Sequence, residues 1–126
     1  NILIKTIVGC DMLKIYGIKS CNSMKKAFDL LTELNLPYEF HDYKKLSIDK
    51  DTLKSWLSEI GQDILLNKKG TTWRKLSAEQ QQVALASEDQ LIDTLIANSS
   101  LIKRPVLKTA QGYIVGFDEE KYRALQ

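Results

Sequence analysis

The feature that most restricts the fold is a strand–helix–strand pattern near the start of the chain. The apolar segment 13–16 predicts a buried strand, and the segment 38–43, in which polarity alternates, predicts a second one. Between them, apolar residues at helical spacing would share one face of a helix: Met24, Ala27, Phe28, Leu31 and Leu34. Because a helix joins the two strands, we expect the strands to lie parallel.

The ends of this helix are marked by residues with special backbone preferences. Asn22 or Ser23 is expected to be the N-cap, since both side chains accept hydrogen bonds from N–H groups of a first helical turn. Asn35 is expected to end the helix in a left-handed conformation, and Pro37 forbids its continuation.

The rest of the chain predicts a series of helices and then a hairpin. Between residues 47 and 100, capping residues repeatedly precede apolar residues at helical spacing. The segments 104–108 and 113–115 predict two strands joined by a tight turn, and Asp118 is placed to cap a last helix. This order predicts an α/β, thioredoxin-like fold (β-α-β … β-β-α, mixed four-stranded sheet) with a helical insert at about residues 47–100 between the two halves.

The chain of 126 residues has the length of one domain. We expect that domain to span residues 12–126, because the first predicted strand follows Met12 directly. Residues 1–11 are interpreted as an N-terminal extension, either a non-native leader or an additional strand. Cys10 lies in this extension and is assigned no role.

Composition excludes several classes of function. The 18 basic and 16 acidic residues leave a net charge of +2, which argues against direct binding of nucleic acid. No apolar run is long enough to cross a membrane, and we expect a cytoplasmic protein. One histidine and two cysteines are too few for a structural zinc site, so no metal is expected.

Cys21 is the strongest candidate for a reactive residue. It follows a strand and immediately precedes a helix, where unpaired N–H groups and the helix dipole stabilise a thiolate and lower the pKa of a thiol. Lys19 adds positive charge nearby. The alternative is an ordinary buried cysteine, which the polar, basic surroundings disfavour.

Met24 occupies the position that a second thiol would take in a Cys-x-x-Cys motif. Without that thiol, a mixed disulfide on Cys21 has to be resolved by an outside thiol, for which glutathione is the expected co-substrate. Ser23 could donate a hydrogen bond to the thiolate or serve only as a helix cap.

Two arginines are candidates for binding an anion. Arg74 follows a Gly-Thr-Thr-Trp loop, and Arg104 precedes Pro105 at the start of a predicted strand. In thioredoxin folds a proline at this point usually has a cis peptide bond and lies beside the active thiol. For each arginine, a solvated surface charge is the alternative role.

The other conspicuous side chains are interpreted as structural. His41, the only histidine, lies on the second predicted strand, which the predicted topology keeps away from Cys21. Trp56 and Trp73 are expected in the core.

Four segments resemble the arsenate reductase-like (ArsC/Spx) family, and in particular its YffB-type branch: 16–27, 41–44, 66–76 and 101–106. The resemblance extends from Met12 to the C-terminus. It implies a thioredoxin-like fold with a helical insert, Cys21 as nucleophile, and Arg74 and Arg104 as catalytic residues that hold an oxyanion.

The YffB-type branch implies a glutathione-dependent thiol reductase that acts on a small oxyanion or a protein thiol, with glutaredoxin as a further partner. The residues expected to bind substrate or glutathione lie beside the thiol and the second arginine: Lys19, Asn22, Ser23, Lys103 and Pro105. Related arsenate reductases carry a third arginine after the last hairpin strand, where this chain has Val115-Gly116-Phe117-Asp118.

Two alternatives stay open. The chain could be an Spx-like transcriptional regulator that binds RNA polymerase, although Met24 removes the Cys-x-x-Cys switch that many such proteins use. It could also be an arsenate reductase coupled to glutathione and glutaredoxin, which the absence of the third arginine disfavours.

Overall fold

A computed structural model describes residues 13–125, which form two compact units. The first unit comprises the described residues up to Asp42 together with those from Arg104 onward, and the second comprises Tyr43–Lys103. The predictions for residues 1–11 and Cys10 lie outside the described residues.

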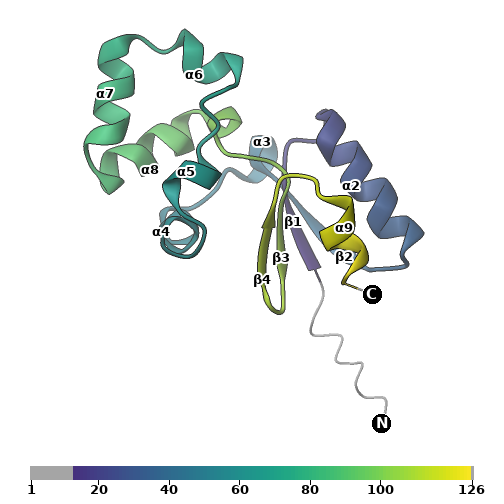
Figure 1. The fold of residues 1–126 in the computed structure, drawn as a ribbon. Helices are drawn as coiled ribbons and strands as arrows, with labels where there is room; N and C mark the ends of the chain where they lie inside the picture. Colours follow the sequence, from purple (N-terminus) through teal and green to yellow (C-terminus); the bar gives the residue numbers. More distant parts are fainter. Residues whose placement is uncertain (1–12, 126) are drawn as a thin grey trace. The chain divides into compact units, whose positions relative to one another are not determined.

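The first unit is built on a mixed sheet with the strand order β2-β1-β3-β4 (Figure 1). Its strands are β1 (Leu13–Gly17), β2 (Tyr38–Asp42), β3 (Val106–Thr109) and β4 (Gly112–Val115). The first two are parallel, as predicted, and place Ile15 opposite Phe40. β3 runs antiparallel to β1 and to β4, which completes the predicted α/β, thioredoxin-like fold.

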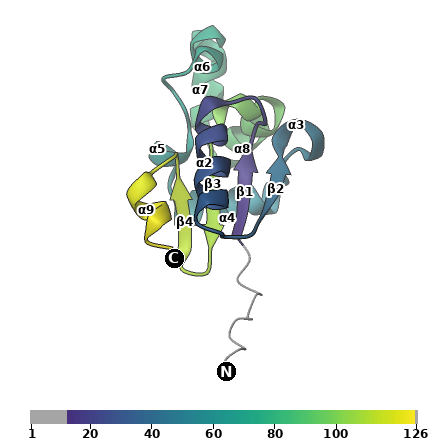
Figure 2. The same cartoon turned by 90° about the vertical axis from the view of Figure 1, so that its right-hand side faces the viewer.

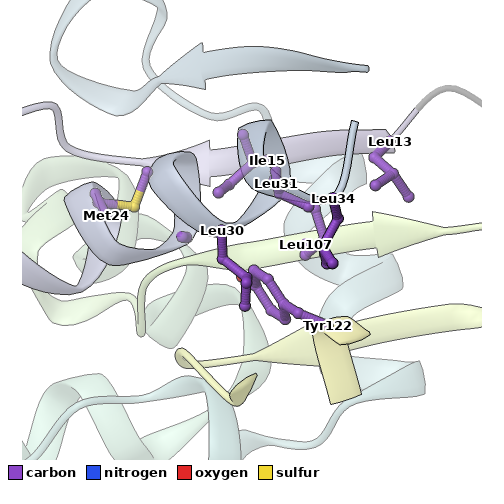
Figure 3. Close-up of a cluster of buried hydrophobic side chains, with 9 residues drawn as sticks. Leu13, Ile15, Met24, Leu30, Leu31, Leu34, Leu107 and Tyr122 are labelled. Carbon is purple, nitrogen blue, oxygen red and sulfur yellow. The ribbon is translucent and has the colours of Figure 1, made fainter. Parts of the chain in front are cut away.

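Helices α2 (Asn22–Glu33) and α9 (Glu119–Arg123) lie on the same face of this sheet (Figures 1 and 2). An ion pair of 3.1 Å between Arg123 Nη2 and Glu33 Oε2 connects the two helices. The core between helices and sheet is formed by Leu13, Ile15, Met24, Ala27, Leu30, Leu31, Leu34, Leu107 and Tyr122. Figure 3 shows Met24 at one end of this cluster and Leu13 at the other.

The C-terminal end of α2 agrees with the prediction for Asn35, which has a left-handed φ of 58°. The N–H of Leu36 donates to the carbonyl of Leu31 (2.9 Å), and the N–H of Asn35 donates to that of Thr32 (3.0 Å). These two bonds satisfy the last carbonyls of the helix in a Schellman motif.

The N-terminal end of α2 differs from the prediction. The helix begins at Asn22, so the N-cap is Cys21, and neither Asn22 nor Ser23 has that position. Both residues have helical backbones within the first turn and contribute N–H groups there.

Several other boundaries also shift. β2 ends at Asp42, because Tyr43 begins the short helix α3 (Tyr43–Leu46). Of the Gly-Thr-Thr-Trp segment that the sequence predicts as a loop, only Gly70 lies outside α6 (Thr71–Lys75). β3 begins after Pro105, whose backbone has no N–H to contribute to a sheet.

The second unit is helical. Besides α3 and α6 it contains α4 (Lys50–Glu59), α5 (Gln62–Leu65), α7 (Ala78–Ala86), α8 (Glu88–Ala97) and the 3₁₀ turn η2 (Ser99–Leu101). Its buried side chains include Trp56 and Trp73, the two residues expected in the core. An ion pair of 3.6 Å between Lys50 and Asp93 joins α4 to α8. Within residues 13–125, no helix combines the length and apolar character that a membrane crossing requires.

Candidate functional site

Cys21 lies where the turn after β1 becomes helix α2. Its N–H donates to the carbonyl of Ile18 at 3.3 Å, which closes the turn, and its own carbonyl accepts the N–H of Lys25 at 3.1 Å, which opens the helix. The backbone of Cys21 is extended (φ −92°, ψ 138°), as an N-cap requires. The sulfur is therefore the side-chain atom at the positive end of α2.

The environment of the Cys21 sulfur favours the thiolate. Burial by itself would raise the pKa of this thiol. The backbone N–H groups of Met24 and Ser23, together with the hydrogen bond and positive charge of Arg104, more than offset that effect and hold the pKa below the usual thiol value. The sulfur does not form a full capping hydrogen bond, but the N–H groups of Met24 and Ser23 still favour its charged form.

Arg104 reaches the sulfur from the segment that leads into β3. The Arg104–Pro105 peptide bond is cis, as the sequence led us to expect. Pro105 is buried, and its carbonyl accepts a hydrogen bond of 2.8 Å from the N–H of Gly116, which ties this segment to the end of β4. The first unit thus brings together Cys21, Arg104 and the first turn of α2.

Gly17 is a further contributor to the site, and the sequence analysis assigned it no role. A Cβ atom at this position would lie less than 3 Å from the sulfur of Met24 and 3.4 Å from Cβ of Arg104. A larger residue here would therefore require the buried Met24 side chain to move, whereas Arg104 would remain at an ordinary contact distance. Gly17 directly follows the predicted strand 13–16, and a glycine at that place does not by itself indicate a close approach.

Met24 replaces a second thiol with a core side chain. It is 0% exposed and belongs to the buried cluster of the first unit. Among residues 13–125, Cys21 is the only cysteine, and it is free. Within the described chain, the chemistry of the site is therefore that of a single thiol.

The other residues expected to bind substrate or glutathione divide between the two units. Lys19 and Asn22 are exposed in the first unit, and Ser23 is half-buried there. Ser23 acts on the sulfur through its backbone N–H. Lys103 is half-buried and belongs to the second unit.

Arg74 also belongs to the second unit, where it lies in α6 and is exposed. Its guanidinium donates a hydrogen bond to the backbone carbonyl of Lys69, five residues earlier. That bond fixes the conformation of the Lys69–Gly70 turn before α6.

Residues 116–118, where related arsenate reductases are expected to carry a third arginine, have structural roles in this chain. Gly116 has a φ of 80°, a conformation in which an arginine would be strained. The ring of Phe117 packs edge-to-face on that of Tyr122, with centroids 5.3 Å apart. The carboxylate of Asp118 accepts the N–H of Lys121 at 3.1 Å and caps α9, as predicted.

His41 packs against the ring of Tyr16, which agrees with the prediction that it is a structural residue. Its imidazole lies 5.0 Å from the ring of Tyr16, centroid to centroid, on neighbouring parallel strands. Among the described residues, no group of three or more His, Cys, Asp or Glu side chains is arranged to hold a metal ion.

Comparison with known families identifies the chain. The model of the ArsC family matches residues 16–125. The chain belongs to the ArsC family. An uncharacterised protein of Haemophilus influenzae is 36% identical over 113 residues, which cover 90% of this chain and 97% of that protein. The global transcriptional regulator Spx of Streptococcus pyogenes is 26% identical over 115 residues, which cover 90% of this chain and 84% of the regulator.

Solved structures support the same assignment. A YffB protein is 43% identical, with a TM-score of 0.82 over 89% of this chain and 96% of that chain. An arsenate reductase-related protein from Brucella melitensis is 41% identical, with a TM-score of 0.68 over 89% of this chain and 92% of that chain. These similarities support the predicted YffB-type branch.

Proposed function

We propose that this protein is a glutathione-dependent thiol reductase that uses Cys21 as its single nucleophile. The observation that carries the proposal is the position of Cys21 as N-cap of α2, where N–H groups and Arg104 hold the pKa of its thiol low. The burial of Met24 at the position of a second thiol supports a mechanism with an external resolving thiol. The glutathione pool of the cytoplasm suits this chemistry, and we propose that location.

The proposed reaction has two exchange steps. In the first, the Cys21 thiolate attacks a disulfide between a substrate and glutathione, forms a bond to the glutathione sulfur and releases the substrate as a thiolate. In the second, a glutathione thiolate attacks the mixed disulfide, so that Cys21 returns to its thiolate form and oxidised glutathione leaves. Two electrons pass from glutathione to the substrate, and the released substrate thiolate takes a proton from water.

Arg104 has two proposed roles in these steps. Its positive charge favours the Cys21 thiolate both as attacking group and as leaving group, since a thiol with a lowered pKa leaves faster. A guanidinium also offers a matching fork of donors to a carboxylate of glutathione. The proposed glutathione contacts are Lys19, Asn22, Ser23, Lys103 and Pro105, and Arg74 is proposed as a second anion-binding arginine.

Arsenate reduction with glutathione and glutaredoxin is a weaker candidate. Residues 115–118 contain no arginine, and Phe117 and Asp118 are engaged in packing and capping. The similarity to Spx over 90% of the chain favours a transcriptional regulator as a second candidate, in which case RNA polymerase would be the partner.

The proposal can be tested by incubating the purified protein with oxidised glutathione and measuring intact mass. Peptide mass of the same samples should assign an adduct to Cys21, none to residue 21 of Cys21→Ser, and slower formation at Cys21 in Arg104→Gln. An adduct on Cys10, which all of these proteins keep, is counted separately. Arg123→Gln is the matched control, because Arg123 is paired with Glu33 and Glu119 at the other end of the first unit's helices. The adduct should disappear when reduced glutathione is added.

A protein that forms no adduct on Cys21 would contradict the proposal. In that case, recovery of the RNA polymerase α subunit in a pull-down would favour the regulator. Arsenate reduction coupled to glutathione and glutaredoxin would favour the arsenate reductase.

A further inference from the structure

The second unit contains a hollow of about 320 Å³ that lies outside the thiol site. It is lined by Asp63, Leu66, Asn67, Lys68, Lys69 and Lys103. All six residues belong to the second unit, so the hollow is formed within one compact part of the chain. Its volume lies at the lower end of the range found for pockets that bind small molecules.

The walls of this lysine pocket are fixed by backbone hydrogen bonds. Leu66 and Ile102 form an antiparallel bridge, the N–H of Asn67 donates to the carbonyl of Leu101 at 2.7 Å, and that of Lys103 donates to the carbonyl of Leu65 at 2.8 Å. The bridge pair and the two apolar residues that precede its members in sequence (Leu65, Leu66, Leu101, Ile102) are at most 3% exposed. The backbones that carry Asn67 and Lys103 are therefore anchored to the core of the unit.

The turn that carries the other two lysines is also held in place. The guanidinium of Arg74 donates to the carbonyl of Lys69. A Cβ atom at Gly70 would lie 2.8 Å from the side-chain amide nitrogen of Asn67, so glycine is what lets that amide lie against the turn. The pocket thus combines fixed main-chain walls with lysine side chains at its rim.

The charges of the pocket are unbalanced. Three lysines face one aspartate, which leaves two positive charges around the hollow. In the part of the chain that the structure describes, no carboxylate lies within 4 Å of the ammonium groups of Lys68, Lys69 or Lys103. Like charges gathered around one hollow repel each other, and a bound anion would remove that repulsion.

We propose that the lysine pocket binds the phosphate group of a small phosphomonoester. A phosphate dianion matches the two unbalanced positive charges, and lysine ammonium groups bind phosphate as point charges. The hollow is larger than a single phosphate group needs, so the attached part of the ester would lie against Leu66 and the amide of Asn67. The pocket shares Lys103 with the contacts proposed for glutathione, but phosphate binding there requires no reaction at Cys21.

The experiment is a titration of the ¹⁵N-labelled full chain with inorganic phosphate and with glycerol 3-phosphate, followed by backbone amide shifts at pH 7.5. Both probes should give saturable shifts at residues 65–69 and 101–103. Lys69→Ala and Lys103→Ala should each weaken binding about fivefold, the expected effect of one nearby charge. Asp63→Asn should tighten binding, because it removes the one opposing charge.

Lys75→Ala is the matched control, since it removes a lysine from the last turn of α6 that does not line the pocket, and it should leave affinity unchanged. Tighter binding of the ester than of inorganic phosphate would identify a phosphomonoester as the preferred source of the group. The proposal is overturned if sodium chloride at equal ionic strength gives the same shifts, or if no saturable shifts occur at these residues. It is equally overturned if phosphate perturbs only residues around Cys21 and Arg104.

Discussion

The N-terminus of α2 differs from those of four other helices of this protein. In α4, α7, α8 and α9, an oxygen of the N-cap side chain accepts the N–H three residues later, at 3.1–3.2 Å. Those N-caps are Asp49, Ser77, Ser87 and Asp118. In α2 the N-cap is Cys21, whose sulfur forms no full capping bond.

The difference separates helix ends whose first-turn N–H groups are bonded by an oxygen cap from one whose N–H groups favour a thiolate. An oxygen cap satisfies N–H groups of the first turn and contributes about 1 kcal/mol to stability. A sulfur at the same place leaves the N–H groups of Ser23 and Met24 available to a negative charge, which is what lowers the pKa of Cys21. We infer that α2 gives up part of its capping energy to obtain a thiolate.

The largest expected effect is that of Cys21→Ser, which converts α2 into a helix of the capped type. At residue 21 the variant should form no glutathione adduct, because the nucleophilic sulfur is gone, and peptide mass separates this position from Cys10, which the variant keeps. Its free energy of unfolding, measured in urea at pH 5.5, should rise by about 0.5–1 kcal/mol, because serine can accept the full capping bond. A serine variant less stable than the wild type at this pH would contradict the idea that α2 lacks a capping bond that the other four helices have.

This stability difference should depend on pH. The pKa of Cys21 is lower in the folded chain than the value of about 8.5 expected for an unfolded thiol. Between those two values the unfolded state binds more protons, so the wild type gains stability as pH rises, and it loses that contribution as pH falls through the folded pKa. The advantage of Cys21→Ser should therefore shrink between pH 5.5 and pH 8.5, as repeated urea titrations would reveal.

The next effect is expected from Gly17→Ala, which disturbs the packing beneath the site. The new methyl group would overlap the buried Met24 side chain, and overpacking of this kind costs about 1–2 kcal/mol. Combining it with Met24→Val should recover part of that loss, giving a favourable coupling in a double-mutant cycle. Purely additive losses would show that Gly17 and Met24 are not in the contact described.

A smaller effect comes from removing one cap of each type. Asp49→Ala should lower the free energy of unfolding by about 1 kcal/mol, since it removes an oxygen cap that accepts the N–H of Thr52. Cys21→Ala, measured at pH 5.5, should cost at most about 0.3 kcal/mol, because no full capping bond is lost. Equal losses in the two variants would mean that α2 is capped like the others.

The smallest effect is expected from Arg104→Gln, which leaves the N–H groups in place. The pKa of Cys21 should rise, since one of its stabilising charges is lost, but it should stay below that of a free thiol because Met24 and Ser23 still act on it. Alkylation rates against pH measure this shift, and Arg104→Lys should retain part of the effect. An unchanged pKa of Cys21 in Arg104→Gln would show that Arg104 does not stabilise the thiolate.

Much of this architecture could be predicted from the sequence, because it rests on local patterns. Alternating or apolar segments gave the strands, and the helical connection predicted that β1 and β2 are parallel. Asn35 and Asp118 were assigned correctly, since their roles depend only on their own side chains and the next few residues. The cis bond before Pro105 followed from the fold type.

The predictions from sequence were wrong or incomplete where contacts between distant parts of the chain determine the structure. Propensity favoured Asn22 or Ser23 as N-cap, but the turn bond from Cys21 to Ile18 sets the start of α2 one residue earlier. The role of Gly17 depends on side chains that are seven and 87 residues away in sequence, Met24 and Arg104, which no local pattern relates to it. The lysine pocket likewise joins residues 63–69 to Lys103 through a bridge of a single residue pair.

The central claim is tested most directly by the pKa of the Cys21 thiol. Initial rates of iodoacetamide alkylation should be measured between pH 4 and pH 10 on the full chain, with modification at Cys21 quantified by peptide mass. The account predicts a midpoint clearly below the ordinary value of about 8.5. A midpoint at or above 8.5 would contradict it.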